Sequence, residues 1–304
     1  MDTVVVTFCE SVARCVGNCP EIPEFSSAKW TVSFRNHLTQ RRDFYFHLTE
    51  VNGTWKHAFQ LPETPMNRQE SYRTIDQINA LPYLVDLRIT LISICRISDT
   101  IYNVMAQFYF ELNCEVHELL KFVLSRSQDR VTKLKFKGIF DEDTDQTLIE
   151  LFKDFYFTNI TIWDYRSIFN DLVRSHFSRT QFTDLDLRSD NWPLQFLEEL
   201  RTHILSPDFN SIAIGNNFTR PFGFDVFESI FLRFMEGKWM GEEKVVLNAV
   251  FEPNAVEALR AYRREELVSV ISDRTLTWEN SGGQKLEVSV ILGIHVLQVL
   301  VKRE

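Results

Sequence analysis

The sequence predicts an α/β fold in which strands and helices alternate as an irregular solenoid, preceded by a small module of helices and a hairpin. Two observations predict the solenoid: a short apolar row recurs along the chain, and stretches with helical spacing lie between its copies. A third observation, an Asn-Gly hairpin signal before the repeats, predicts the separate module. The chain has 304 residues, 44% of them hydrophobic, so it is long enough to bury a large core.

The recurring row places apolar residues at its first, fourth and sixth positions, and the last two suit a strand with one buried face. These last two positions step along the chain by 26, 25 and 27 residues. Such a period lies within the roughly 20 to 29 residues of leucine-rich repeats, whose strand carries the same row. Four copies are clear: Val131, Leu134 and Phe136; Phe157, Ile160 and Ile162; Phe182, Leu185 and Leu187; Phe209, Ile212 and Ile214.

The repeat is irregular, and an ordinary alternating α/β domain is the alternative interpretation. A leucine-rich repeat has Asn or Cys three residues after the row, and here only Asn217 meets that expectation. The stretches with helical spacing begin at Thr144, Tyr165, Pro193 and Phe224. In the third of them, apolar residues three or four apart make one continuous stripe, which predicts a helix with one buried face.

The two ends of the chain differ from the repeats. Near the C-terminus, Gly282-Gly283 lies between two alternating runs and predicts a hairpin, followed by a closing strand that would cap the solenoid. Near the N-terminus, Asn52-Gly53 predicts a second hairpin, after helical stretches at residues 6–16 and 22–38. We therefore expect an N-terminal module at residues 1–62, a linker or first turn at 63–82 and a repeat domain at 83–304.

Composition argues against two classes of partner. The net charge is −9 and the sequence pI is about 5.4, so the chain would repel a nucleic-acid backbone. No apolar run approaches the roughly 20 residues that a membrane-spanning helix needs. The five cysteines are odd in number and no secretory signal precedes them, which predicts reduced thiols in a soluble cytoplasmic or nuclear protein. We expect neither nucleic-acid nor membrane partners.

No motif indicates catalysis, a cofactor or a metal ion. Cys9, Cys15 and Cys19 are spaced by six and four residues, which does not match a structural zinc site. Residues 141–146, DEDTDQ, resemble half of a calcium loop, but Gln146 stands where that loop requires Gly. These acids are better explained as the capped start of a helix. We expect a protein that is not an enzyme and needs no cofactor; an enzyme with an unrecognised site is the alternative.

The polar residues between the apolar positions of each row predict a binding surface. Side chains alternate between the two faces of a strand, so these polar residues, Thr161 among them, should point away from the core. Stacked strands would join these residues into one sheet surface of mixed charge, which suits a protein partner. The alternative interpretation is a surface that only contacts solvent, with weak ion pairs between adjacent strands. Trp163 is the expected hot spot, because aromatic residues dominate interface energetics. The expected partner-binding residues are Lys133, Lys135, Lys137, Trp163, Asp184, Asp186 and Arg188.

The N-terminal segments MDTVVVTFCESVARCV, SSAKW, RRDFYFHL and NGTW resemble the start of the nematode F-box-related uncharacterised proteins, in which a degenerate F-box precedes strand–helix repeats. Val5-Val6 would replace the Leu-Pro pair that opens an F-box, and Trp30 would be its tryptophan. The resemblance implies an adaptor that docks on the Skp-type subunit of a cullin–RING ubiquitin ligase while its repeats hold an unidentified protein substrate. Phe8, Val12 and Trp30 would be the docking anchors. The alternative is a repeat scaffold without ligase association.

Overall fold

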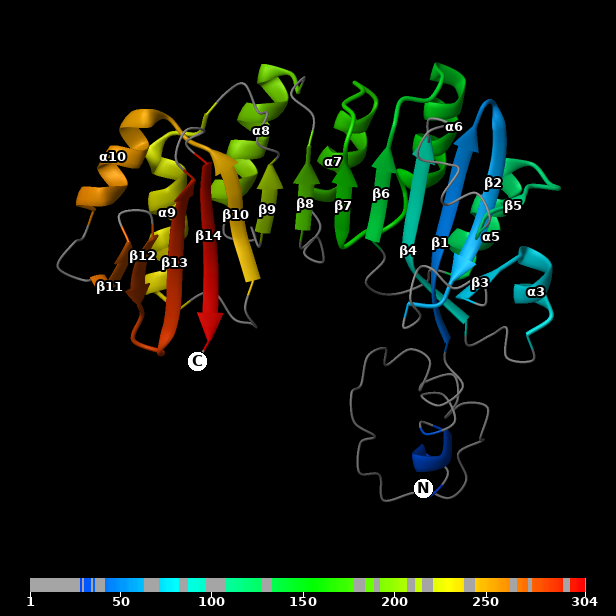
Figure 1. Cartoon of the computed structure of the whole chain (residues 1–304), viewed down its shortest axis with the longest axis horizontal. Coiled ribbons are helices and arrows are strands. Elements are labelled where there is room, and N and C mark those ends of the chain that lie inside the picture. The colour runs from blue at the N-terminus through cyan, green and yellow to red at the C-terminus, as the bar shows by residue number, and fades with distance from the viewer. Residues whose placement is uncertain are drawn as a thin grey trace. The chain divides into compact units, whose positions relative to one another are not determined.

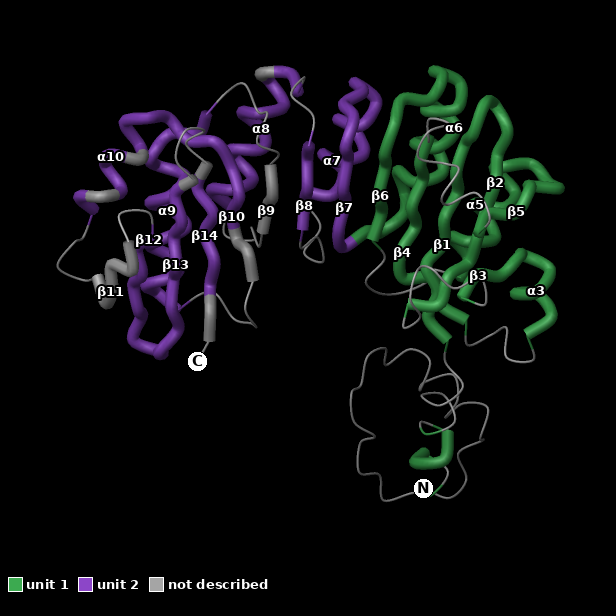
Figure 2. The backbone as a smooth tube through the Cα atoms, in the orientation of Figure 1, with its two compact units in different colours: residues 1–157 green, residues 158–304 purple. Residues whose placement is uncertain are grey.

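The structure is a computed structural model, and it describes most of the chain. The described residues are 28, 30–33, 35, 42–62, 71–81, 87–96, 108–126, 133–177, 184–188, 192–206, 211–214, 221–237, 244–262, 267–272, 275–291 and 296–303. The chain divides into two compact units, residues 1–157 and 158–304, which are described separately below (Figure 2). Each unit combines strands and helices, with both parallel and antiparallel strand pairs, so the predicted α/β class is confirmed.

Unit 1 contains a sheet in the order β3-β2-β1-β4-β6, with β5 also paired to β2. Strands β1, β4 and β6 are parallel, whereas β2 pairs antiparallel with β1, β3 and β5. Its elements are β1 (Arg42–Val51), β2 (Thr54–Gln60), β3 (Tyr72–Arg73), α3 (Ile75–Asn79), β4 (Leu87–Arg96), β5 (Phe110–Glu111), α5 (Val116–Arg126), β6 (Lys133–Lys137) and α6 (Glu142–Phe152).

The predicted N-terminal hairpin is present. Asn52 and Gly53 join β1 to β2 with φ angles of 50° and 77°, the left-handed conformation that a two-residue turn of this kind requires. Strand β1 also pairs in parallel with β4, which begins after the expected linker at residues 63–82. The hairpin is therefore an integral part of the sheet of unit 1, since the hydrogen-bonded edge of β1 is completed only by a strand beyond the expected linker.

One face of the sheet of unit 1 packs against helices (Figure 1). Helix α5 contacts β4 and α6. Rows of apolar side chains in register across β1, β4 and β6 form the buried layer: Phe46, Ile92 and Leu134 in one row, and Leu48, Ile94 and Phe136 in the next. The ring of Phe136 contacts that of Phe152 from α6, with ring centroids 5.9 Å apart. Alternating strand residues and one helix face therefore close this core, and a second buried cluster is formed by Ala58, Tyr72 and Phe108.

Unit 2 contains a sheet in the order β7-β8-β9-β10-β14-β13-β12-β11. Strands β7, β8, β9 and β10 pair in parallel. From β10 onward, the pairs β10–β14, β14–β13, β13–β12 and β12–β11 are antiparallel. The elements are β7 (Asn159–Ile162), α7 (Phe169–Phe177), β8 (Asp184–Leu187), α8 (Leu194–Leu205), β9 (Ser211–Ile214), α9 (Phe224–Met235), β10 (Lys244–Val250), α10 (Pro253–Ala261), β11 (Leu267–Ser272), β12 (Thr275–Glu279), β13 (Gln284–Ile291) and β14 (Val296–Arg303).

The strand–helix alternation predicted from the apolar rows is confirmed in unit 2. The last two positions of three rows lie in register on β7, β8 and β9: Ile160, Leu185 and Ile212, then Ile162, Leu187 and Ile214. The four described side chains of these rows, those on β7 and β8, are buried. The predicted helices begin close to the expected residues, as α7, α8 and α9 show. A recurring apolar row therefore aligns successive strands, because equivalent residues must share one buried layer.

The C-terminal hairpin and closing strand are also present. Strands β12 and β13 form the hairpin around Gly282 and Gly283, and β14 lies between β13 and β10. Asn280 fastens the hairpin turn to the end of α9: its Nδ2 donates to the carbonyl of Phe234 at 2.9 Å, while its Oδ1 accepts from the amides of Gly282 and Gln284. The edge of β10 that β9 leaves free is thereby paired with β14.

The predicted helix cap at the DEDTDQ segment is confirmed. Asp141 is the N-cap of α6, and its carboxylate accepts hydrogen bonds from the amide of Thr144 at 2.9 Å and from its hydroxyl at 2.8 Å. These hydrogen bonds lower the pKa of Asp141. Among the described residues, no helix has the length and apolar character needed to cross a membrane.

The turn after β6 depends on a glycine. Gly138 has a φ of +96°, and a Cβ atom there would lie 2.8 Å from the Cβ of Arg96 and 3.0 Å from its carbonyl oxygen. Arg96 in turn donates from Nη1 to the carbonyl of Ile139 at 2.7 Å and pairs with the buried carboxylate of Glu50. The end of β6 therefore approaches the backbone of β4 too closely for any side chain.

We expect Gly138→Ala to lower the free energy of unfolding by more than about 1 kcal/mol, because both the positive φ and the contact with Arg96 oppose a methyl group. Urea denaturation of the full chain measures the change. Gly53→Ala is the matched control, because Gly53 also has a positive φ but open space around it. An equal loss in both variants would show that the close approach to β4 contributes nothing.

We expect Asp141→Ala to destabilise the chain by about 1 kcal/mol at pH 7, as the loss of a helix cap does. Because folding lowers the pKa of Asp141, its stabilisation is present above the pKa of the unfolded chain and disappears as pH falls through the folded value. The difference between the variant and the natural chain should therefore shrink below about pH 4. Urea denaturation at pH 7 and pH 3 measures it, with Asp141→Asn, which keeps a capping oxygen, as the control.

Candidate partner-binding faces

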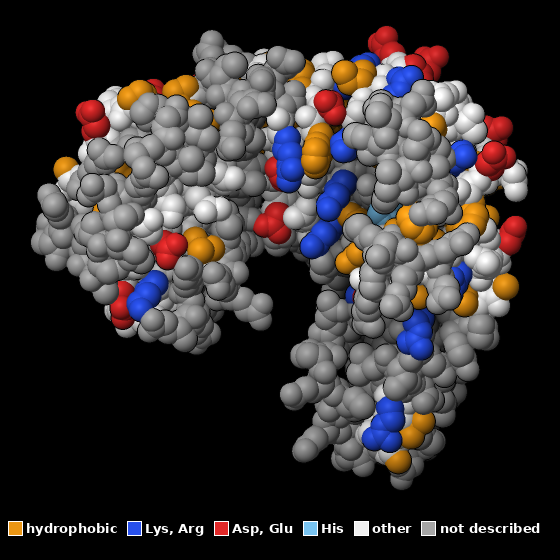
Figure 3. Space-filling model, in the orientation of Figure 1, with side chains coloured by type: hydrophobic (Ala, Val, Ile, Leu, Met, Phe, Trp, Pro, Cys, Tyr) orange, Lys and Arg blue, Asp and Glu red, His pale blue; other side chains and the backbone are white. Residues whose placement is uncertain are grey.

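The open face of unit 1 carries the predicted lysine row. On β6, Lys133, Lys135 and Lys137 are exposed, while Leu134 and Phe136 between them are buried. This alternation is the predicted one, because successive side chains of a strand point to opposite faces. Figure 3 shows Lys and Arg side chains following one another along the region of β6 on the face that the view presents.

A bulge sets which side chains of β4 share this open face. Asp43 lies opposite Arg88 and Phe44 opposite Ile89, but the next residue of β1, Tyr45, lies opposite Leu91. Thr90 is therefore an extra residue in β4 without a partner in β1. An extra residue shifts the alternation by one position, so Arg88 and Leu91, three residues apart, end up on the same face.

Arg88 and Asp43 form a close ion pair at one end of the open face. Arg88 donates from Nε to Oδ1 of Asp43 at 3.1 Å and from Nη2 to Oδ2 at 3.0 Å. The two side chains are 15% and 34% exposed, respectively. Two parallel hydrogen bonds between guanidinium and carboxylate hold both groups in place, so the negative charge of Asp43 is already engaged.

His47 lies on the same face of β1 as Tyr45, beside the ring of Tyr109, as a neutral side chain. It lies in register with Ser93 of β4, which in turn lies opposite Lys135 of β6. Its Nε2 donates to Oε1 of Gln60 at 2.9 Å. Burial of the ring lowers the pKa of His47 to about 4; the hydrogen bond with Gln60 opposes this shift, and the charge of Lys135 adds to it. Near neutral pH His47 therefore adds no positive charge.

These residues surround a cavity of about 570 Å³, which we call the β4 cavity. Its volume is within the range of small-molecule sites, roughly 300 to 1,000 Å³. Three strands contribute to it, together with Pro62, which follows β2. Its lining consists of Asp43, Tyr45, His47, Pro62, Arg88, Thr90, Leu91, Ser93, Lys133 and Lys135. Lys137, the third lysine of the row, is not part of the lining.

Three of the four predicted residues of unit 2, Trp163, Asp186 and Arg188, come together at the ends of β7 and β8, whereas Asp184 lies at the start of β8. On β8, Leu185 and Leu187 are buried, while Asp184 and Asp186 are partly exposed. The guanidinium carbon of Arg188 lies over the ring of Trp163, 4.4 Å from its centroid. Arg188 also pairs with Asp186 at 2.8 Å. We call Trp163, Asp186 and Arg188 the tryptophan cluster.

Trp163 is 38% exposed and therefore accessible, as predicted. Its position follows from register, because the amide of Arg188 donates to the carbonyl of Ile162 at 2.9 Å and so places residue 188 beside residue 163. Thr161, which was also expected to point outward, is only 5% exposed, so that expectation is wrong. Strand alternation determines which face a residue lies on, but neighbouring side chains determine whether it reaches solvent.

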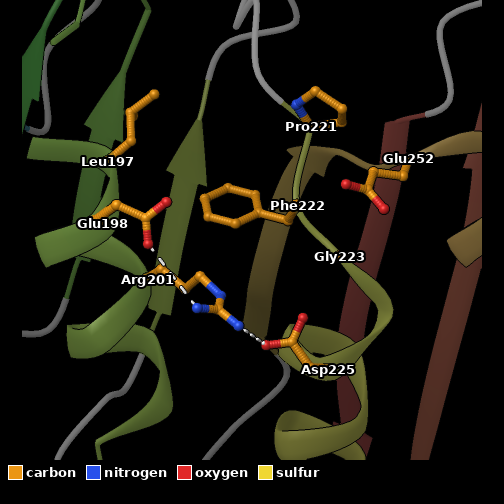
Figure 4. Close-up of a pocket in the computed structure, with 8 residues that line it drawn as sticks. All are labelled: Leu197, Glu198, Arg201, Pro221, Phe222, Gly223, Asp225 and Glu252. Carbon is orange, nitrogen blue, oxygen red and sulfur yellow. Dashed lines mark hydrogen bonds and ion pairs between the residues drawn. The ribbon is translucent and has the colours of Figure 1, made fainter. Parts of the chain in front are cut away.

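A second cavity, of about 490 Å³, lies in unit 2 where α8 meets the starts of α9 and α10 (Figure 4). Arg201 of α8 reaches from Glu198 to Asp225 of α9, and it forms ion pairs with both. Phe222 and Glu252 line the opposite side, where the amide of Glu252 donates to the carbonyl of Phe222 at 3.0 Å. Sequence patterns did not indicate this cavity, because its residues come from three separate stretches of the chain, 197–201, 221–225 and 252.

The predicted anchors of the N-terminal module are only partly described. Phe8 and Val12 lie outside the described residues, as do Cys9, Cys15 and Cys19. Trp30 is partly buried, in a stretch whose described residues are helical. Within the described ranges, no group of three or more His, Cys, Asp or Glu side chains is arranged to hold a metal ion.

Comparison with known proteins gives no match: no family model fits the chain, and neither the curated proteins nor the solved structures include a significantly similar one.

Proposed function

We propose that the protein is a non-enzymatic interaction adaptor that binds a protein partner through the open strand faces of its units. The observation that carries this proposal is the one-sided burial of β6 and β8, on which every second side chain is buried and those between are polar and accessible. We further propose that the strand–helix units are irregular leucine-rich repeats, which present such a strand face for binding. The period of the apolar rows supports this assignment.

The tryptophan cluster is the proposed centre of the contact in unit 2. Trp163 offers a large apolar surface, and Arg188 is held over its ring by Asp186. Stacking between a guanidinium and an aromatic ring stabilises both, which reduces the conformational entropy that a partner must overcome on binding. Trp and Arg are also the residues most often found at the energetic centre of protein interfaces.

We propose that the N-terminal module links this binding surface to a cullin–RING ubiquitin ligase, through the Skp-type subunit, in the cytoplasm or nucleus. The resemblance of the N-terminal segments to the F-box-related proteins supports this proposal, and so does the helical conformation around Trp30. A repeat scaffold without ligase association is the alternative. The two proposals differ in one observable, the binding of a Skp-type adaptor.

Charge reversal of the strand face tests partner binding. We expect the double variant Asp184→Lys and Asp186→Lys to lose the partner, because it reverses the local charge and removes the ion pair that holds Arg188. Its stability should fall by less than about 1 kcal/mol, since surface ion pairs contribute little. Quantitative affinity capture from a cell extract, combined with urea denaturation, measures both effects.

Glu257→Lys is the matched control for this experiment, because Glu257 is an exposed carboxylate of unit 2 that lies on α10 and not on a strand. The control should retain every protein that the natural chain captures. A partner that binds both variants equally well would show that the strand face of β8 is not the contact.

Replacement of Trp30 separates the adaptor from the scaffold. If the N-terminal module docks on a Skp-type adaptor, Trp30→Ala should weaken binding of the purified adaptor by at least about tenfold, as loss of a buried aromatic anchor does. Calorimetry of the full chain measures this binding, and circular dichroism shows whether the variant folds. Absence of adaptor binding by the natural chain would contradict ligase association and leave the scaffold.

A further inference from the structure

The β4 cavity holds an uncompensated positive charge. The described residues of its lining include three cationic side chains, Arg88, Lys133 and Lys135, and one carboxylate, Asp43, which leaves two positive charges among them. The carboxylate is engaged by Arg88 through two hydrogen bonds, so it does not neutralise the lysines. Within the described part of the chain, neither Lys133 nor Lys135 forms an ion pair.

The two lysines are held close together on one side of the cavity. They are two residues apart on β6 and both exposed on its open face, which places their Cα atoms about 7 Å apart. Two ammonium groups on such neighbouring stems repel each other, and a single anion between them converts that repulsion into two attractive contacts. The oxygens of one tetrahedral anion can accept from both groups at once.

Neutral hydrogen-bonding groups complete the cavity. Tyr45 lies in register with Leu91 and Lys133, and Ser93 lies between His47 and Lys135. Among the described residues, the hydroxyls of Tyr45 and Ser93 have no protein partner, so both remain able to donate to a ligand. Nδ1 of His47 is an acceptor, because Nε2 carries the proton that is donated to Gln60.

The cavity is larger than the anionic group of a ligand alone requires. A volume of about 570 Å³ exceeds that of a bare inorganic anion several times over, so the cavity has room for an organic group beside the anion. The ring of Tyr45 and the side chains of Leu91 and Pro62 provide an apolar wall for that group. The ligand therefore combines a compact anion with an apolar or aromatic body.

We propose that the β4 cavity binds a small phosphate monoester, with its phosphoryl oxygens held by Lys133, Lys135 and the hydroxyl of Ser93, and its organic part against Tyr45 and Leu91. A phosphate monoester carries close to two negative charges near neutral pH, which matches the two uncompensated positive charges; a carboxylate or sulfonate would match only one. This inference does not rest on the proposed protein partner, because every described residue that lines the cavity belongs to unit 1.

Calorimetric titration of the full chain with phenyl phosphate tests the assignment. We expect saturable binding of phenyl phosphate, and clearly weaker binding of benzenesulfonate, which has the same ring and a tetrahedral anionic group but a single charge. Equal affinity for the two would overturn the assignment of a doubly charged ligand. Absence of saturable phenyl phosphate binding would overturn the cavity as an anion site.

Lysine variants locate the bound group. Lys133→Gln and Lys135→Gln should each weaken phenyl phosphate binding about tenfold, because each removes one charge-assisted contact. Lys137→Gln is the matched comparison: it removes the same charge from the same strand, outside the cavity lining, and should change binding by less than about twofold at physiological ionic strength. Equal weakening by all three substitutions would show diffuse attraction and overturn the site. Urea denaturation verifies that each variant folds.

A peptide that carries one phosphotyrosine distinguishes a free ester from a phosphorylated protein. We expect phenyl phosphate to bind at least as tightly, because the apolar wall accommodates the ring alone; tighter binding of the peptide would overturn the free ester as the ligand. The outcome is also separable from the proposed function. Loss of partner capture on charge reversal at Asp184 and Asp186 concerns unit 2, so either result can fail while the other stands.

Discussion

One-sided burial of β6 and β8 is the constraint on which the binding surfaces of the structure depend. A strand carries side chains on both faces, and on these two strands only one face packs into the core. On β6 this leaves Leu134 and Phe136 in the core and three lysines outside. The same division on β8 leaves Leu185 and Leu187 inside. The surface available for binding is therefore a direct consequence of how the core is closed.

Register converts these separate strands into shared surfaces. Parallel neighbours place equivalent residues side by side, so each buried row continues from strand to strand, and the polar row beside it continues too. The bulge at Thr90 is the exception that shapes the β4 cavity, because it brings Arg88 and Leu91 to one face of β4.

Charge is distributed unevenly over this framework. The chain as a whole has a net charge of −9, yet the described residues that line the β4 cavity include two more cationic side chains than carboxylates. In the tryptophan cluster the opposite holds, since Arg188 is engaged both by Asp186 and by the ring of Trp163. The first arrangement suits an anionic ligand that brings the missing charge, and the second suits a preorganised contact surface.

The sequence by itself determined the features that depend on neighbours along the chain. The apolar rows predicted the strands, the three- and four-residue spacing predicted the helices, and Asn52-Gly53, Gly282-Gly283 and Asp141 predicted two turns and a cap, because each signal reflects local backbone geometry. Tertiary structure alone decided the pairing of β1 with β4, the bulge, the β4 cavity and the burial of Thr161. These features join residues such as Asp43 and Arg88, 45 positions apart, and the register between distant strands is set by packing in the whole core.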